Sequence, residues 1–371
     1  MGSDSKLLRS VGDIEVRMKV VEQKRATRKG RSDRTSSIFA QAPCRADLAG
    51  STLDLWPLYL FHPGAVTINF AVNILTTCRI VTLHGKEIRL RSADAHTEER
   101  FRDLDQLCQA KQVRHQLAAR LLEFFQPDEG LLLETNSESP AGAGIAGSSA
   151  MMIATAAALA RLTGRTFSRD ELRIVAQNIE AQVIRVPTGC QDYYPALYGG
   201  VNAVELSPDG IHRQSIAVPA EEIEARFVLC YTGAPRKSGI NNWAVFKAHI
   251  NGNRHVHRNF AEIAEIACEM REALGNADWR EVGRLLRREW KLRRTNAPGI
   301  STPFIEKLIA AAQKQGSVAA KVCGAGGGGC VVFLTENGAR DRVSEVLRRT
   351  GAKVLPFRVS REGLSVTSLQ S

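Results

Sequence analysis

Short runs in which apolar residues dominate or alternate with polar ones mark the first third of the chain. Alternation of period two puts the apolar side chains on one face of a strand. We expect strands at 37–50, 66–73, 78–83, 87–91 and 131–135. These strands supply one sheet of an N-terminal lobe.

Helical spacing replaces this alternation in three segments. Residues 98–125 carry leucines three and four positions apart, which predicts a helix. Residues 150–160 consist mostly of strong helix formers. Residues 168–184 begin with Ser168 and Glu171, the spacing of a capping box, and we expect a helix there as well.

The second half of the chain repeats both patterns. We expect strands at 200–206, just after 210 and at 226–232, a junction at 217–225, and a helix-rich block over 242–315. Apolar stretches end at Val322 and begin again at Cys330. The fold class is therefore α+β with two lobes, which we divide into a basic N-terminal arm (1–36), an N-terminal domain (37–218) and a C-terminal domain (219–371).

Composition places the chain among ordinary globular proteins. It has 371 residues, of which 44% are hydrophobic and 24% charged. No apolar run approaches the ~20 residues that span a bilayer, and no signal-peptide core is present. The scattered cysteines include no Cys-x-x-Cys pair, which argues against a zinc site and a disulfide framework. We expect a cytoplasmic protein without a membrane partner.

The net charge of +11 indicates anionic partners. Much of the excess lies in the arm and in the segment 284–294. No aromatic residues alternate with these basic residues, so the sequence argues against nucleic-acid binding. A basic pocket for a phosphorylated small molecule accounts for part of the charge equally well.

The most informative segment is Glu138–Ala150, in which Gly142, Gly144 and Gly147 precede Ser148 and Ser149. Glycines leave the backbone N–H groups accessible, and the start of the following helix favours an anion. The segment has no lysine after the last glycine, as a Walker A loop would. It predicts a phosphate-binding loop, with a structural glycine turn as the alternative.

Two more segments sharpen this prediction. Gly324-Ala-Gly-Gly-Gly-Gly329 lets a backbone approach a ligand closely, whereas a loose hairpin is the alternative. Ala42–Asp54 gathers Arg45, Asp47 and Asp54 near the end of a strand. The three segments, in this order, resemble the motifs of the GHMP kinases, and the resemblance runs from about residue 38 to near the C-terminus.

The resemblance implies a fold and a branch of the family. The fold would be an N-terminal domain like ribosomal protein S5 domain 2 and a ferredoxin-like C-terminal domain, with the active site between them. Gly189–Gly200, with Gln191-Asp192, and Tyr231–Ser238 are similar to the branch that phosphorylates heptose 7-phosphate, fucose or arabinose. Ser51-Thr52 and Tyr193 depart from the patterns of the sugar-kinase relatives and leave the sugar open.

The resemblance also implies roles for single residues, with ATP and Mg²⁺ as cofactors. Asp192 would be the catalytic base and Arg45 its partner, and Ser149 and Glu180 would hold the magnesium ion. The residues expected to bind ATP are Pro140, Gly142, Gly144, Ile145, Ala146, Gly147, Ser148 and Ser149. Those expected to bind the substrate are Asp54, Asp47, Thr52, Arg236, Gly326 and Gly327.

The resulting hypothesis is an ATP-dependent kinase that phosphorylates a sugar or sugar phosphate, with the anomeric hydroxyl as the expected acceptor and a heptose 7-phosphate-like substrate favoured. The alternatives are a catalytically silent sensor of sugar and nucleotide, a kinase of the mevalonate or homoserine branch, and a nucleic-acid binder that uses its basic arm. The partner is a small sugar or sugar phosphate, and a homo-oligomer stays open.

Overall fold

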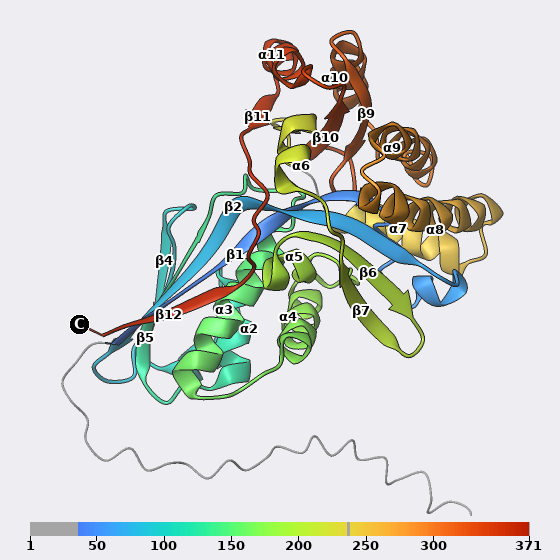
Figure 1. Ribbon diagram of the computed structural model, residues 1–371. Coiled ribbons are helices and arrows are strands. Elements are labelled where there is room, and N and C mark those ends of the chain that lie inside the picture. Colours follow the sequence, from blue (N-terminus) through green and yellow to red (C-terminus); the bar gives the residue numbers. More distant parts are fainter. Residues whose placement is uncertain (1–35, 236–237, 371) are drawn as a thin grey trace, which may run out of the picture. The chain divides into compact units, whose positions relative to one another are not determined.

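The computed structural model describes residues 36–235 and 238–370, and these contain two sheets (Figure 1). The larger sheet has the order β12-β1-β2-β5-β3-β4, and β6 and β7 extend it beside β2. Its strands are β1 (Ser36–Ala49), β2 (Val66–Leu83), β3 (Ile88–Ser92), β4 (Thr97–Phe101), β5 (Gly130–Ser137), β6 (Val201–Ser207), β7 (Gly210–Ser215) and β12 (Ser365–Gln370). The expected α+β class is confirmed.

The long strand β2 is the centre of this sheet. Its first half pairs with β6, its second half with β5, and β1 runs antiparallel to it along almost its whole length. The two strands that we expected at 66–73 and 78–83 are therefore one, because Asn73 to Cys78 keep extended geometry through a bulge opposite Pro43/Cys44.

Helices cover one face of the larger sheet. Buried side chains of β1, β2, β3 and β5 pack against α2, α3, α4 and α5 in one apolar cluster. These helices and the shorter ones near them are α1 (Leu104–Gln109), α2 (Gln116–Phe125), α3 (Gly147–Thr163), α4 (Arg169–Ile184), α5 (Tyr193–Tyr198) and the 3-10 helix η1 (Leu58–Phe61). The capping box of α4 is confirmed, since Glu171 N–H donates to Ser168 Oγ and Ser168 N–H to the Glu171 carboxylate.

The helix expected over 98–125 is wrong at its start. Residues 97–101 form β4 and pair antiparallel with β3, and only α1 and α2 are helical. In β4, Glu98 and Arg100 make ion pairs with each other, and Glu98 pairs with Arg91 of β3. These cross-strand charges favour the hairpin over the helix that the leucine spacing predicts.

The smaller sheet has the order β11-β8-β10-β9, with antiparallel neighbours. Its strands are β8 (Phe227–Tyr231), β9 (Ser317–Val322), β10 (Cys330–Thr335) and β11 (Lys353–Leu355). The helices of this part are α6 (Ala220–Arg226), α7 (Ser238–Ile250), α8 (Arg254–Gly275), α9 (Trp279–Arg293), α10 (Pro303–Gln313) and α11 (Arg340–Thr350). The segment 217–225, expected to be a junction, thus contains most of α6.

The chain returns to the larger sheet at its end. β12 pairs antiparallel with the first half of β1, so residues 365–370 lie beside residues 36–41 (Figure 1). We assign residues 219–371 to the C-terminal domain because they are consecutive in sequence. Residues 365–370, however, form a strand of the larger sheet, whose other strands belong to the N-terminal domain. The division at residue 218 stays a proposal, and the arm at 1–36 lies outside the described residues but for Ser36.

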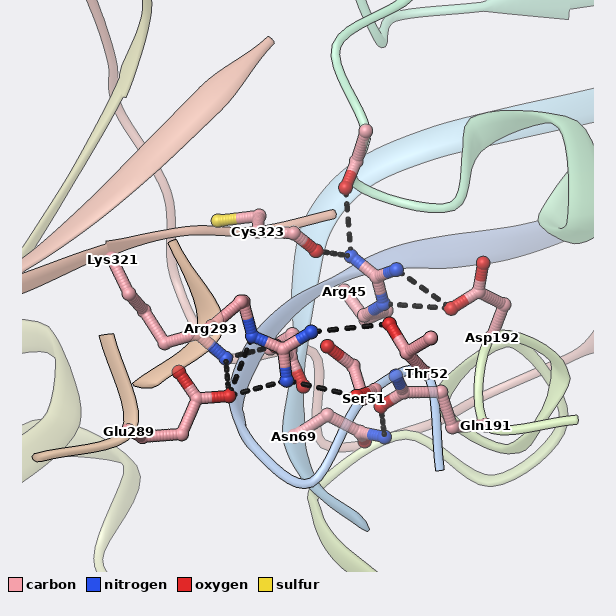
Figure 2. Close-up of polar contacts among 12 residues, drawn as sticks. Arg45, Ser51, Thr52, Asn69, Gln191, Asp192, Glu289, Arg293, Lys321 and Cys323 are labelled. Carbon is pink, nitrogen blue, oxygen red and sulfur yellow. Dashed lines mark hydrogen bonds and ion pairs between the residues drawn. The ribbon is translucent and has the colours of Figure 1, made fainter. Parts of the chain in front are cut away.

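A buried ion network joins the two sheets. Lys321 of β9 donates to Asp47 of β1 and, over 3.2 Å, to Glu289 of α9, and all three side chains are fully buried. Arg293, one turn after Glu289, donates to the same carboxylate (Figure 2). Two cations and two carboxylates thus neutralise one another, which is the condition for burying charge at tolerable cost.

We expect Lys321→Met to lower the free energy of unfolding by about 3–5 kcal/mol, because it leaves Asp47 buried without its cation. Urea denaturation followed by circular dichroism measures this loss. Lys307→Met, on the exposed side of α10, is the control and should change stability by less than about 0.5 kcal/mol. Equal effects of the two substitutions would show that the network contributes nothing specific.

Candidate active site

Arg45 lies where the three sequence motifs meet. Strand β1 carries it, and alternation along the strand puts Arg45 and Asp47 on the same face. Its Nε and Nη2 donate to Asp192 Oδ1 over 3.0 and 2.6 Å, and its Nη1 donates to the carbonyls of Gly144 (2.8 Å) and Cys323 (2.7 Å) (Figure 2). One guanidinium therefore joins the first motif, the phosphate loop, the Asp192 turn and the C-terminal glycine motif.

The two partners of this ion pair differ in exposure. The side chain of Arg45 is 3% exposed and that of Asp192 is 23% exposed. Burial disfavours the charge of Arg45, but the charges of Asp192 and Asp47 outweigh burial and raise the pKa of the guanidinium. Arg45 is thus a permanent cation that lies behind a carboxylate reachable from solvent.

The phosphate loop ends directly in helix α3. Gly142 and Gly144 have positive φ, and Ala146, which precedes the helix, also adopts the left-handed region. No side chain of the described residues caps α3, so its first N–H groups keep no side-chain acceptor. Gly147 is required by space, because a Cβ there would lie 2.9 Å from the Cβ of Ser139. Uncapped donors at a helix start bind anions well.

The structure brings together Ser149 and Glu180, the two residues expected to hold the magnesium ion. Ser149 Oγ donates to Glu180 Oε2 over 2.9 Å, and the Tyr193 hydroxyl donates to the same oxygen over 2.6 Å. Ser148, more exposed, also interacts with Glu180. Burial raises the pKa of Glu180, against the hydrogen bonds from the three hydroxyls. A buried carboxylate and hydroxyl oxygens are hard donors that fit Mg²⁺.

The C-terminal glycine motif contacts the phosphate loop. Cys330 N–H donates to the Ala143 carbonyl over 2.6 Å, and a Cβ on Gly329 would lie 2.7 Å from that oxygen. Gly326, also with positive φ, approaches the Ile300 carbonyl so closely that a Cβ would lie 2.3 Å from it. Gly327 is exposed and donates its N–H to the same carbonyl. Gly329 therefore allows close backbone packing against the phosphate loop, and Gly326 allows it against Ile300 within the C-terminal part of the chain.

Asp54 lies against the turn that carries Asp192. Its Oδ2 accepts the Gln191 N–H over 2.9 Å, and a Cβ on Gly189 would lie 2.0 Å from that oxygen. Burial and the charge of Asp192 raise the pKa of Asp54 to about 7, although the Gln191 N–H acts in the opposite direction. Asp54 and Asp192 thus lie at the same turn in different environments, since Asp54 is buried and Asp192 is partly exposed.

The other residues expected to bind the substrate differ in burial and in their partners. Thr52 Oγ1 accepts from Arg293 Nη1 over 3.1 Å, and Arg293 Nη2 donates to the Ser51 carbonyl over 2.8 Å. Asp47 is fully buried in its pair with Lys321, a position that favours support of the site over contact with a substrate. Arg236 lies outside the described residues.

Two cavities are relevant to the site, one beside α3 and one that Thr52 and Arg293 border. A cavity of about 300 Å³ lies beside α3, and Met151, Met152, Thr155, Arg114 and His115 are among its lining residues. A small cavity of about 10 Å³, room for one water molecule, is bordered by Thr52, Arg293 and the start of the C-terminal glycine motif.

Sequence reasoning missed two parts of this arrangement. Arg293 belongs to the basic cluster 284–294, which we interpreted as excess charge, but it is buried and holds the Ser51–Thr52 backbone. Its spacing of four from Glu289 on an amphipathic helix was the available signal. The 300 Å³ cavity had no signal, because its lining comes from β3, α2, β5, α3 and α4.

Two family models match the chain. The model described as GHMP kinases N terminal domain matches residues 110–200, and the model described as GHMP kinases C terminal matches residues 270–353. The first match includes the phosphate loop, Glu180 and Asp192, and the second includes Arg293 and the C-terminal glycine motif.

Similar proteins of known name cover nearly the whole chain. A D-glycero-alpha-D-manno-heptose 7-phosphate kinase of Campylobacter jejuni is 24% identical over 88% of this chain and 98% of its own length. A mevalonate kinase of Pyrococcus furiosus is 24% identical over 89% of this chain and 98% of its own. The crystal structure of a D-glycero-D-manno-heptose 1-phosphate kinase from Bacteroides thetaiotaomicron superposes with a TM-score of 0.71, at 22% identity, and covers 90% of this chain and 100% of its own. The chain is thus similar to the GHMP kinases in both of their domains.

Proposed function

We propose that the protein transfers the γ-phosphoryl group of ATP to a hydroxyl of a sugar or sugar phosphate. The observation that carries this proposal is the contact of Arg45 with Asp192, Gly144 and Cys323, which assembles a base, a phosphate loop and the glycine motif around one point. Phosphoryl transfer needs positioning and charge neutralisation above all, and this assembly supplies both.

In the proposed reaction Asp192 is the general base. Its carboxylate accepts the proton of the attacking hydroxyl, whose oxygen forms a bond to the γ-phosphorus while the bond from that phosphorus to the β,γ-bridging oxygen breaks. ADP leaves with the electrons of the broken bond. Arg45 holds Asp192 through two N–H groups and neutralises charge from behind, so the base stays oriented.

The nucleotide would lie along α3. Its phosphates would accept hydrogen bonds from the loop at the start of the helix, and its base would enter the 300 Å³ cavity lined by Met151, Met152 and Thr155 of the same helix. The separation suits an ATP molecule, because the cavity lies one to two turns beyond the loop. When bound beside Ser149 and Glu180, a magnesium ion would neutralise the charge of the phosphates.

A sugar phosphate with a heptose 7-phosphate-like structure is the substrate we favour, and the anomeric hydroxyl is the acceptor. The Gln191-Asp192 turn, the name of the Campylobacter relative and Asp54 beside that turn support this choice. The equally long match to a mevalonate kinase keeps the mevalonate branch as the second candidate, and it rests on that similarity alone.

A coupled ADP-release assay with Mg·ATP and a panel of acceptors tests the proposal. The panel contains heptose 7-phosphate, fucose, arabinose, galactose, mevalonate and homoserine. We expect turnover with one sugar or sugar phosphate, and phosphorus NMR of the product then identifies the hydroxyl. Asp192→Asn should reduce kcat by about 10³-fold while ATP affinity stays nearly unchanged. Exposed Asp128→Asn is the control. ATP binding without turnover on any acceptor would favour the sensor alternative.

Glu180→Gln keeps an oxygen for Ser149 and Tyr193 but removes the charge that would hold the cation. We expect the magnesium concentration for half-maximal activity to rise about tenfold or more. Titration of activity with MgCl₂ at fixed ATP measures it, with exposed Glu123→Gln as control. An unchanged requirement would make Glu180 a purely structural acid.

Asp54→Asn should change how stability depends on pH. The pKa of Asp54 is about 7 in the folded protein against 3.8 as its ordinary value, so the folded state binds a proton that the unfolded chain releases between these pH values. Its contribution to stability is therefore present at pH 4 and is lost as the pH rises to 7. We expect the variant to gain about 2 kcal/mol on the wild type between pH 5 and pH 8. Urea denaturation at both values measures it, and a gain independent of pH would exclude this origin.

A further inference from the structure

Three histidines from separate elements meet outside the proposed active site. His62 follows η1, His249 lies in the last turn of α7, and His257 lies in the first turn of α8. One ring nitrogen of each lies within 4.8 Å of the other two. The proposed phosphoryl transfer uses none of them.

Hydrogen bonding alone does not satisfy this cluster. His62 Nε2 and His249 Nε2 lie 2.7 Å apart, so a single proton is shared between them. Among residues 36–235 and 238–370, His249 Nδ1 is buried without a hydrogen-bond partner, and His249 is only 1% exposed. Whichever ring carries the shared proton, His249 keeps a ring nitrogen that is neither solvated nor bonded, a costly arrangement.

His257 is oriented in the manner of a metal-bound imidazole. Its Nε2 lies 2.9 Å from the carbonyl oxygen of His249. Because a carbonyl only accepts, Nε2 carries the proton and Nδ1 keeps its lone pair. A ring N–H donated to a backbone carbonyl is the usual outer contact of histidines that ligate metals.

The surroundings of the rings are buried and apolar, with His62 5% and His249 1% exposed. The rings of Phe61 and Phe260 lie 5.5 and 5.3 Å from the His249 ring, centroid to centroid. The neutral imidazole is the form that binds a metal ion.

We propose that His62, His249 and His257 form a binding site for a divalent transition-metal ion of the zinc class. Three imidazoles without a carboxylate in the cluster exclude Mg²⁺ and Ca²⁺, which prefer oxygen, and suit Zn²⁺. Tetrahedral coordination at 2.0–2.1 Å needs nitrogens about 3.3 Å apart, so the His62–His249 contact opens only slightly. Water would take the fourth position.

The site would brace the substrate side of the molecule. η1 follows the segment that carries Thr52 and Asp54, and α7 supplies Asn242 and Val245 to the small cavity beside Thr52. An ion bound by all three histidines ties η1 to α7 and α8. The absence of paired cysteines, which argued against zinc, does not bear on a site made of histidines.

The test uses full-length protein without a histidine tag, stripped with a chelator and free of nucleotide. We expect the wild type to bind about one equivalent of Co²⁺ with the intense visible absorption of a tetrahedral site, and Zn²⁺ to displace it. His62→Asn and His257→Asn should each weaken binding more than about 100-fold. His255→Asn is the matched control, since exposed His255 lies on the same helix turn as His257 and contacts Thr295.

Two outcomes would overturn the proposal. One is wild-type protein that takes up neither ion, and the other is uptake that the His62 and His257 variants retain. Should a variant not fold, the wild type decides alone, because a bound ion raises its midpoint of thermal unfolding by about 3 °C or more at excess Zn²⁺. None of these readouts involves kinase activity, so the metal site and the proposed function are tested separately.

Discussion

The guanidinium of Arg45 is the interaction on which the site depends. Its planar fork donates to a carboxylate on one side and to two main-chain carbonyls on the other, and the most distant acceptor, Cys323, lies 278 residues from Arg45 in sequence. A lysine ammonium has three donors but lacks this planar fork, so it would not reach the same acceptors on both sides. Because the guanidinium is buried and always charged, it orients the carboxylate of Asp192, which remains partly exposed to solvent.

The sequence predicted the parts of the site whose chemistry is local. The glycines of 142–147 and 324–329, the capping box of α4 and the pair of Ser149 with Glu180 follow from residue type, spacing and the family resemblance. The class of fold followed from alternation and helical spacing, since both depend on neighbours in the chain.

The remaining features depend on contacts between distant residues. From the sequence, Arg293 is one of several arginines expected at the surface. In the structure it is buried and donates hydrogen bonds to Glu289 and to the Ser51 carbonyl. Asp47 was expected to support Asp54 at the substrate, and its carboxylate pairs with the buried Lys321. The helix expected over 98–125 rested on leucines from residue 104 onward, and pairing with β3 makes residues 97–101 a strand instead. The burial of these side chains and the pairing of this strand depend on residues far away in the sequence, which a local sequence pattern does not include.

The pairing of β12 with β1 has a consequence for biosynthesis. Thr367 and Phe39, whose backbones pair, are 328 residues apart in sequence. During translation the part of β1 that pairs with β12 keeps an open edge until β12 has been made. An unpaired edge is a template for association with other chains. β12 therefore closes an edge that stays exposed while more than 300 intervening residues are synthesised.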